Sequence, residues 1–240
     1  MNIQKVTKPA RKVLKLKRCG AVIVAAGSAS RMGGIDKILT DLKGEPVIVH
    51  TVRAFQECPA ISEIVVVTTP DKIEKIMALC RGFEKLKAVV AGGSSRPESV
   101  TNGLNALSKN VKLAAIHDGA RPLVTWEVID RTVRAANTYG AAAPGVPMKD
   151  TIKVVAGGIV KSTPDRSTLQ AVQTPQVVDI DLLRGALQKA KEDQVHITDD
   201  CSAVEYMGMS VKMVQGDEAN IKITTPLDLK IAEVILEGRQ

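Results

Sequence analysis

A turn rich in glycine and serine, followed by two cations, carries the strongest chemical signal in this sequence. The turn follows an apolar run and reads A-A-G-S-A-S-R-M-G-G-I-D-K over residues 25–37, with Arg31 and Lys37 six residues apart. Small residues let backbone N–H groups approach an anion closely, so such a turn can bind phosphate oxygens. The two cations would add positive charge where negative charge develops during phosphoryl or nucleotidyl transfer. An ordinary turn between a strand and a helix, with both cations in solvent, explains this segment alone equally well.

A second polar segment reads H-D-G-A-R-P and begins at His117, where another apolar run ends. A carboxylate such as Asp118, at the carboxyl end of a buried strand, is well placed to meet Mg²⁺ or a ribose hydroxyl. Arg121 could pair with this carboxylate or with a phosphate, and a structural ion pair is the simpler interpretation of the segment alone. His117 is interpreted as a hydrogen-bonded residue at the end of a strand, because no nucleophile lies near it in the sequence for a general base to activate.

A third segment, G-G-S-S-R-P-E-S over residues 92–99, follows a predicted strand and opens a predicted helix. It offers backbone donors and the Ser99 hydroxyl to a base or a phosphate, although a loop with a helix cap is the favoured interpretation without context. The remaining polar fragments are typical of turns or sheet edges when taken one by one: Lys149-Asp150-Thr151, Asp165-Arg166, Gln173-Thr174-Pro175-Gln176, Thr198-Asp199-Asp200 and Asn220-Ile221-Lys222-Ile223-Thr224.

The positive charge of the chain is concentrated at its N-terminus. Residues 1–18 contain seven basic residues and no acidic one, whereas the other 26 basic residues are balanced by the 26 acidic residues, so the net charge of +7 belongs to this segment. We expect residues 1–18 to form a basic, disordered and solvated arm. Contact of this arm with RNA or an acidic lipid is the less favoured alternative, and no nucleic acid or membrane is expected to bind the domain itself.

Composition disfavours several classes of protein. Five aromatic residues are too few for a surface that stacks single-stranded nucleic acid, and no apolar run approaches the roughly 20 residues of a membrane span. The turn at residues 25–37 matches neither the P-loop nor the G-x-G-x-x-G dinucleotide motif. Three scattered histidines and four cysteines without C-x-x-C spacing predict no zinc site. The cysteines are interpreted as reduced thiols of a cytoplasmic protein, with Cys58, Cys80 and Cys201 acting as small core residues.

Short β-rich runs alternate with helical patterns from residue 20 onward, which predicts a doubly wound α/β fold with a mostly parallel, Rossmann-like sheet. In such sheets ligands bind beyond the carboxyl ends of the strands, where the loops at residues 27–37 and 118–122 lie. Strands are predicted at 21–26, 64–68, 87–90, 113–117 and 211–214, and helices at 46–55, 71–80, 96–107, 126–138, 181–191 and after Pro226.

The β/α pattern is interrupted once, over residues 147–173. Pro147, Gly157, Gly158 and Pro164 separate short β-prone pieces at 151–155 and 159–162, which predicts a protruding hairpin or arm. The pattern resumes afterwards, and no internal repeat is present. We therefore expect one domain over residues 19–240 that contains this excursion.

The fragments, in this order and spacing, resemble one family over residues 19–237: the 2-C-methyl-D-erythritol 4-phosphate cytidylyltransferases of the non-mevalonate isoprenoid pathway. The resemblance is carried by A-A-G-x-x-x-R-M-G…K, G-G-x-x-R-x-x-S-V, H-D-x-A-R-P, D-T-I-K, D-R…Q-T-P-Q, T-D-[DE]-[CA]-S-A-x-E and N-I-K-[IV]-T. Several matches in register outweigh the ordinary interpretation of each one. The resemblance implies a nucleotidyltransferase-type sheet, transfer of a cytidylyl group from CTP with Mg²⁺, and release of pyrophosphate.

The resemblance also implies a role for individual residues. Arg31 and Lys37 resemble the pair that stabilises the pentacoordinate α-phosphate, and Arg166 and Lys222 resemble the residues that align the attacking phosphate. The pocket for cytosine and ribose would comprise Ala25, Ala26, Gly27, Gly93 and Ser99, with Asp118 at the ribose and metal region and Gly119 beside it. The methylerythritol phosphate site would comprise Arg121, Thr151, Arg166, Thr174, Thr198 and Lys222.

Residues 147–170 match the β-arm that members of this family exchange in a homodimer, so Thr151 and Arg166 are expected to serve the site of the neighbouring subunit. The implied chemistry agrees with the residues present. A phosphate oxygen is already anionic at pH 7, so the attack needs no general base, and positioning and charge neutralisation are sufficient. Mg²⁺ can be held largely by the triphosphate, so a single aspartate at position 118 would complete its site.

Two other functions remain open at this point. A related cytidylyltransferase acting on ribitol 5-phosphate would share the nucleotide site, although Ala120 before Arg121 favours the methylerythritol phosphate enzyme. A nucleotide-binding module without catalysis is the second alternative, against which the joint presence of Arg31, Lys37, Asp118, Arg166 and Lys222 speaks.

Overall fold

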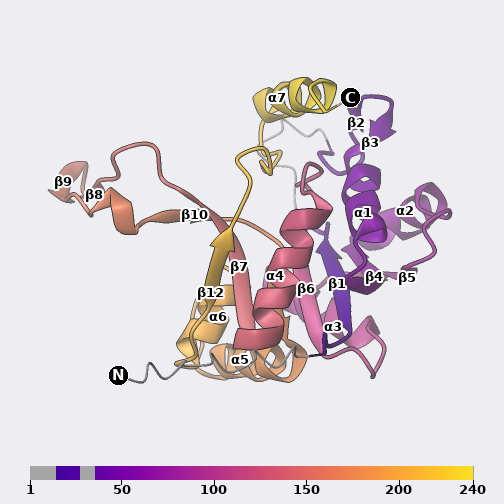
Figure 1. The fold of residues 1–240 in the computed structure, drawn as a ribbon, viewed down its shortest axis with the longest axis horizontal. Coiled ribbons are helices and arrows are strands. Elements are labelled where there is room, and N and C mark those ends of the chain that lie inside the picture. The colour runs from indigo at the N-terminus through magenta and orange to yellow at the C-terminus, as the bar shows by residue number, and fades with distance from the viewer. Residues whose placement is uncertain (1–14, 28–35, 240) are drawn as a thin grey trace, which may run out of the picture.

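The computed structural model describes residues 15–27 and 36–239, and an eight-stranded mixed sheet forms its centre (Figure 1). Its strands are β1 (Cys19–Val24), β4 (Ile61–Thr68), β5 (Leu86–Ala91), β6 (Leu113–Asp118), β7 (Ala141–Pro147), β10 (Gln170–Val172), β11 (Gln176–Asp179) and β12 (Lys212–Gln215). Their order is β10-β7-β11-β6-β1-β4-β5, and β12 pairs with β7 outside this path. The pairs among β6, β1, β4 and β5 are parallel, as is the pair of β12 with β7, whereas β10 and β11 run antiparallel to their neighbours.

Helices cover both faces of the sheet, which confirms the doubly wound fold. On one face lie α1 (Val47–Glu57), α2 (Ile73–Leu79) and α4 (Trp126–Tyr139), and on the other lie α3 (Arg96–Ala106), α5 (Ile180–Glu192) and α6 (Asp200–Tyr206). Ala21 and Ile23 of β1 pack into the core under the first face, and Val22 packs into the core under the second. Both faces of this strand are buried, which is why its sequence is continuously apolar rather than alternating.

The last helix, α7 (Pro226–Glu237), lies at the end of the molecule where the strands of the parallel part terminate (Figure 1). It packs through Ala232 on a small separate core that includes Leu42 and Ile223. Thr225 and Asp228 form a capping box at its start, so the first turn has its N–H groups satisfied. The short strands β2 (Asp41–Leu42) and β3 (Glu45–Pro46) form a hairpin near this core, and two 3₁₀ turns span Pro70–Lys72 and Arg166–Thr168.

The predicted excursion is present as an arm that leaves the sheet after β7 and returns at β10. Its distal part is a two-stranded hairpin of β8 (Val154–Ala156) and β9 (Ile159–Ser162), which projects far from the sheet in Figure 1. All seven residues of these two strands are exposed, including Val155 and Ile159. Gly157 and Gly158 both have positive φ at the turn, a conformation that glycine adopts without strain.

The sequence pattern missed the strands on one side of the sheet. No strand was predicted at β7, β10 or β11, although β7 lies between the other two. Pro144 and Gly145 interrupt β7, and its first residues are small alanines, so its sequence has low strand propensity. β10 lies within the predicted excursion at residues 147–173, and β11 begins at Gln176, the last residue of a fragment interpreted as typical of a turn or a sheet edge. The predicted strand at 151–155 lies instead at β8.

The four cysteines are buried and form no disulfide, which for Cys58, Cys80 and Cys201 confirms their interpretation as core residues. Within residues 15–27 and 36–239, none of the helices is both long enough and apolar enough to cross a membrane. The predicted basic arm lies mostly outside the described residues. Of its cations that the structure describes, Lys17 forms an ion pair with Asp179 at 3.0 Å.

Candidate functional site

A cavity of about 370 Å³ lies at the carboxyl end of β1 and β6, where a doubly wound sheet is expected to bind its ligand. Segments that are far apart in the sequence form its wall: the end of β1, the start of α3, the end of β6 and the segment before α7. Most of the predicted nucleotide residues line it, together with one residue predicted for the acceptor. The predicted residues in the wall are Ala25, Ala26, Gly27, Lys37, Gly93, Ser99, Asp118 and Lys222.

The loop before α3 forms one side of the cavity and is held by hydrogen bonds within itself. The Ser99 hydroxyl accepts a hydrogen bond from the N–H of Gly93 at 3.1 Å and donates one to the carbonyl of Ser95 at 2.9 Å. The Glu98 carboxylate accepts hydrogen bonds from the N–H and the hydroxyl of Ser94 at 2.8 and 2.7 Å. A Cβ at position 93 would lie 2.1 Å from the Glu98 side chain, so only glycine fits there. The loop therefore presents a fixed backbone surface to a ligand.

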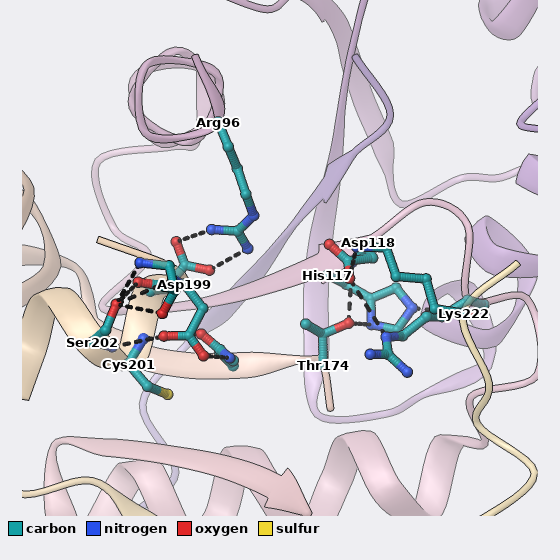
Figure 2. A network of polar contacts seen from close by, with 12 residues as sticks. Arg96, His117, Asp118, Thr174, Asp199, Cys201, Ser202 and Lys222 are labelled. Atoms are coloured by element: carbon teal, nitrogen blue, oxygen red, sulfur yellow. Dashed lines mark hydrogen bonds and ion pairs between the residues drawn. The ribbon is translucent and has the colours of Figure 1, made fainter. Parts of the chain in front are cut away.

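Asp118 also lines the cavity and lies among cations. Lys222 approaches its carboxylate to 2.9 Å (Figure 2). Arg121 approaches it to 3.5 Å, which confirms the predicted Asp–Arg pair. Burial raises the pKa of Asp118, but Lys222 and Arg121 outweigh this effect and lower it to about 2. Asp118 is thus ionised at neutral pH and is the carboxylate available to a metal ion or a hydroxyl in the cavity.

A scaffold of hydrogen bonds behind the cavity fixes Asp118 and Lys222. The N–H of Asp118 donates to the Thr174 hydroxyl at 3.1 Å, and the amide of Asn220 donates to the carbonyl of Thr174 at 2.9 Å. The guanidinium of Arg121 donates to the carbonyl of Asn220 at 2.7 Å. Thr174 and Arg121 therefore support the site in this chain, and neither is among the residues that line the cavity. Gly119 lies beside them and donates its N–H to the carbonyl of the last residue of β1 at 2.9 Å.

His117 is a buried structural residue and not a general base, as the sequence indicated. Its Nδ1 lies 3.0 Å from the Thr174 hydroxyl and its Nε2 lies 3.2 Å from the carbonyl of Arg121, so both ring nitrogens are engaged. Its ring packs against Phe55 with the centroids 4.8 Å apart. Burial lowers the pKa of His117 to about 4, so the imidazole is neutral at pH 7.

This depressed pKa predicts a loss of stability in mild acid. Between about pH 6.5 and pH 4 the unfolded chain binds a proton at His117 that the folded chain excludes. The free energy of unfolding should therefore fall by up to about 3 kcal/mol from this group as the pH decreases through that window. Urea unfolding of the wild type and of His117→Asn, measured from pH 7 to pH 4, should show a smaller pH dependence in the variant. Equal dependence in both would contradict this assignment.

Three of the predicted acceptor residues lie neither in the cavity wall nor in the hydrogen-bonded scaffold behind it. Thr151 and Arg166 are exposed on the arm and do not line the cavity of their own chain. The guanidinium of Arg166 donates to the carbonyl of Lys149 at 2.6 Å, within the arm. Thr198 is exposed just before α6, where its N–H donates to the Ser202 hydroxyl at 3.1 Å. Arg31 lies outside the described residues.

Among the cavity residues that the sequence analysis did not select for the site, Arg96 is the charged one. Arg96, the first residue of α3, lines the cavity and forms two hydrogen bonds with Asp200, at 2.6 and 3.1 Å. A cation in the first turn of a helix interacts unfavourably with the helix dipole. The position of Arg96 therefore indicated that its guanidinium needs a carboxylate partner. That partner is 104 residues away in the sequence and could not be identified from a local pattern.

The described residues offer little to a metal ion. No group of three or more histidine, cysteine, aspartate or glutamate side chains with metal-site geometry occurs in the ranges 15–27 and 36–239. Among the described residues that line the cavity, Asp118 is the only one with a carboxylate, and Glu98 lines a different cavity. A single carboxylate fits Mg²⁺ only where a ligand such as a polyphosphate supplies most of the oxygens.

Comparison with known proteins gives one consistent result. The family described as 2-C-methyl-D-erythritol 4-phosphate cytidylyltransferase (IspD) matches residues 19–238. A protein of this name from Caldanaerobacter subterraneus subsp. tengcongensis is 47% identical over 221 residues, which cover 90% of this chain and 97% of the relative. Another, from Desulforamulus reducens, is 45% identical over 224 residues, which cover 91% of this chain and 96% of the relative.

Solved structures agree with the sequence comparison. The crystal structure of 4-diphosphocytidyl-2C-methyl-D-erythritol synthase from Anaerococcus prevotii has a TM-score of 0.84 at 29% identity, covering 92% of this chain and 96% of that chain. The crystal structure of 2-C-methyl-D-erythritol 4-phosphate cytidylyltransferase from Thermus thermophilus has a TM-score of 0.75 at 30% identity, covering 92% and 99% of the two chains. The similarity therefore extends over the sheet and over the segments that form the cavity.

Proposed function

Because the chain belongs to the 2-C-methyl-D-erythritol 4-phosphate cytidylyltransferase family, we propose that the cavity at the end of β1 and β6 is where it carries out the family's reaction. The chain is a CTP-dependent cytidylyltransferase of the non-mevalonate isoprenoid pathway. The observation that carries the assignment of the site is the convergence of Lys37, Asp118 and Lys222 with the loop before α3 on one cavity. These segments are far apart in the sequence, and their convergence on one cavity supports a common ligand.

In the proposed reaction, an oxygen of the acceptor phosphate forms a bond with the α-phosphorus of CTP, and the bond from that phosphorus to the departing pyrophosphate breaks. No proton needs to be removed, because the attacking phosphate is already anionic at neutral pH. Lys37, with Arg31, neutralises the charge that develops on the α-phosphate. Lys222 holds the attacking phosphate in line, and Asp118 fixes the ammonium of Lys222 and accepts a hydrogen bond from a ribose hydroxyl.

The residues of the cavity fit a magnesium ion bound together with CTP. Asp118 would supply one oxygen ligand, and the triphosphate would supply most of the others. When bound, the ion neutralises charge on the triphosphate and on the departing pyrophosphate. The low pKa of Asp118 keeps this ligand ionised at neutral pH.

The choice of acceptor is tested by pyrophosphate release. The purified chain is incubated with CTP and Mg²⁺, and with either 2-C-methyl-D-erythritol 4-phosphate or ribitol 5-phosphate. We expect turnover with methylerythritol phosphate and a kcat/KM at least 100-fold lower with ribitol phosphate. Turnover with ribitol phosphate alone would reject the acceptor, and no turnover with either would favour a module that binds nucleotide without catalysis.

We propose that the arm acts across a homodimer. The hairpin exposes four large apolar side chains, those of Val154, Val155, Ile159 and Val160. A partner subunit would cover this apolar surface. Thr151 and Arg166 lie on the same arm, away from the cavity of their own chain. In a dimer that exchanges arms, these two residues would complete the acceptor site of the neighbouring subunit.

Replacing Arg166 with alanine should therefore weaken use of the acceptor while CTP binding survives. We expect the KM for methylerythritol phosphate to rise about 10-fold or more, the scale for losing a charge-assisted contact with a phosphate, with the Kd for CTP within about twofold of the wild type. Initial rates and calorimetric titration with CTP measure the two quantities. Loss of CTP binding in this variant would contradict the separation of roles. Lys161→Ala, on the exposed hairpin of the same arm, is the matched control.

A further inference from the structure

Asp200 is a buried carboxylate that the reaction described above does not use. Its side chain is 1% exposed and is the partner of Arg96, whose side chain is 30% exposed at the cavity wall. Two parallel hydrogen bonds, at 2.6 and 3.1 Å, join the carboxylate to the guanidinium. This bidentate geometry fixes the direction of the guanidinium as well as its distance. Arg96 is thus held in one orientation beside the cavity by a group that does not line it.

The ion pair joins two loops that belong to different halves of the site. Arg96 begins α3 directly after Ser95, whose carbonyl and side chain are part of the loop that presents Gly93 and Ser99 to the cavity. Asp200 begins α6 directly after the loop that contains Thr198. Figure 2 shows Arg96 reaching from α3 toward the start of α6. The first loop is assigned to the nucleotide and the second to the acceptor.

Hydrogen bonds fix the start of α6, so the position of Asp200 also fixes the loop that precedes this helix. Asp199 and Ser202 form a capping box with bonds of 2.8 and 3.1 Å. Gln176 of β11 donates to the Asp199 carboxylate at 2.7 Å and accepts from the N–H of Cys201 at 2.9 Å. This network anchors α6 to the sheet. Among the hydrogen bonds found in the described parts of the chain, only the two that Asp200 accepts from Arg96 extend it to α3.

We propose that Asp200 is a positioning residue of the reaction: it holds the guanidinium of Arg96 in the cavity wall and fixes the nucleotide loop before α3 relative to the acceptor loop before α6. This inference rests on the proposed function, because it requires that the cavity bind both substrates. Arg96 adds positive charge near Asp118 and Lys37 in the same wall. Fixing both loops through one ion pair makes the binding of each substrate dependent on the same contact.

A double substitution distinguishes an ion pair that positions the site from one that only stabilises the fold, because the two roles predict different kinetics. Removing one partner of a buried pair leaves an uncompensated charge, whereas replacing both with apolar residues of similar volume is often neutral for stability. Asp200→Asn should therefore lower the Tm and raise the KM for both CTP and methylerythritol phosphate about 10-fold or more. The double variant Arg96→Met/Asp200→Leu should recover a Tm close to that of the wild type while both KM values stay at least 10-fold raised.

Recovery of both KM values together with the Tm in the double variant would overturn the proposal, since the pair would then contribute only to folding. Arg96→Lys provides an independent measurement, because it keeps the charge and loses the bidentate geometry. We expect a Tm within a few degrees of the wild type and a severalfold rise in both KM values, and unchanged values would also overturn the proposal. Asp193→Asn, which breaks the exposed pair with Lys189, is the matched control and should change neither KM.

These outcomes are distinguishable from failure of the proposed function. The wild type is assayed in parallel with CTP, Mg²⁺ and methylerythritol phosphate. If the wild type forms no product with this acceptor, the assignment of the reaction fails, and the effect of Asp200 is then judged from the Kd for CTP alone. With an active wild type, the variants test only the role of the ion pair.

Discussion

Replacing Lys37 with alanine is expected to lower kcat by about 100-fold or more, the scale for removing one preorganised charge from a transition state. Lys37 lines the cavity close to the end of β1, and its ammonium would face the α-phosphate. The loss should appear in kcat rather than in the Kd for CTP, because charge on the α-phosphate increases as the reaction proceeds. Initial rates of pyrophosphate release, together with calorimetric titration with CTP, measure both quantities.

Arg31→Ala should give a loss of the same order, since both cations are assigned to one phosphate. Lys75→Ala is the matched control, because this lysine is exposed on α2 and does not line the cavity. Nearly normal turnover in both Arg31→Ala and Lys37→Ala would mean that the triphosphate does not lie against the loop that follows β1.

Replacing Lys222 with methionine is expected to lower kcat/KM for methylerythritol phosphate by about 100-fold or more. Methionine keeps most of the length of the side chain and removes the charge that holds the attacking phosphate. The change also removes the nearest cation to Asp118, at 2.9 Å, and so raises the pKa of this carboxyl from about 2 toward its ordinary value. Arg121, at 3.5 Å from the carboxylate, still favours the ionised form of Asp118 in this variant.

The Kd for CTP in Lys222→Met should stay within a few-fold of the wild type, measured by calorimetric titration. Lys189→Met is the control, because it removes a cation from an exposed pair outside the cavity. A variant that loses CTP binding and acceptor use to the same extent would contradict the assignment of Lys222 to the acceptor.

The parallel half of the fold was predictable because its elements carry strong local signals. β1 is a continuous apolar run, β4 contains another at residues 64–67, and α1 and α4 have clear amphipathic patterns. The antiparallel side was not predictable in the same way. β7 contains proline and glycine, and β10 and β11 are short, so pairing with neighbouring strands, and not local propensity, makes these segments extended.

The candidate site was predictable where its residues lie in turns that follow strands. Asp118 follows this rule, as do the residues of the loop after β1, because the topology alone brings the carboxyl ends of parallel strands to one edge. Arg96 and Asp200 were not selected, since their pairing depends on how α6 packs beside α3. Burial also sets the protonation state of a residue, which residue type alone does not determine. It lowers the pKa of His117 and makes this residue a neutral structural group, although histidine is a common general base.

A crystal structure of the chain with CTP and Mg²⁺ tests the central claim most directly. A larger cavity of about 730 Å³ lies between α3 and α5 and shares Ser94 and Ser95 with the site cavity, so the nucleotide has two places to bind. We predict density for the triphosphate beside Lys37 and Asp118, with the cytosine against Gly93 and Ser99. A nucleotide in the cavity between α3 and α5, with Lys37 and Asp118 away from every phosphate, would contradict the account.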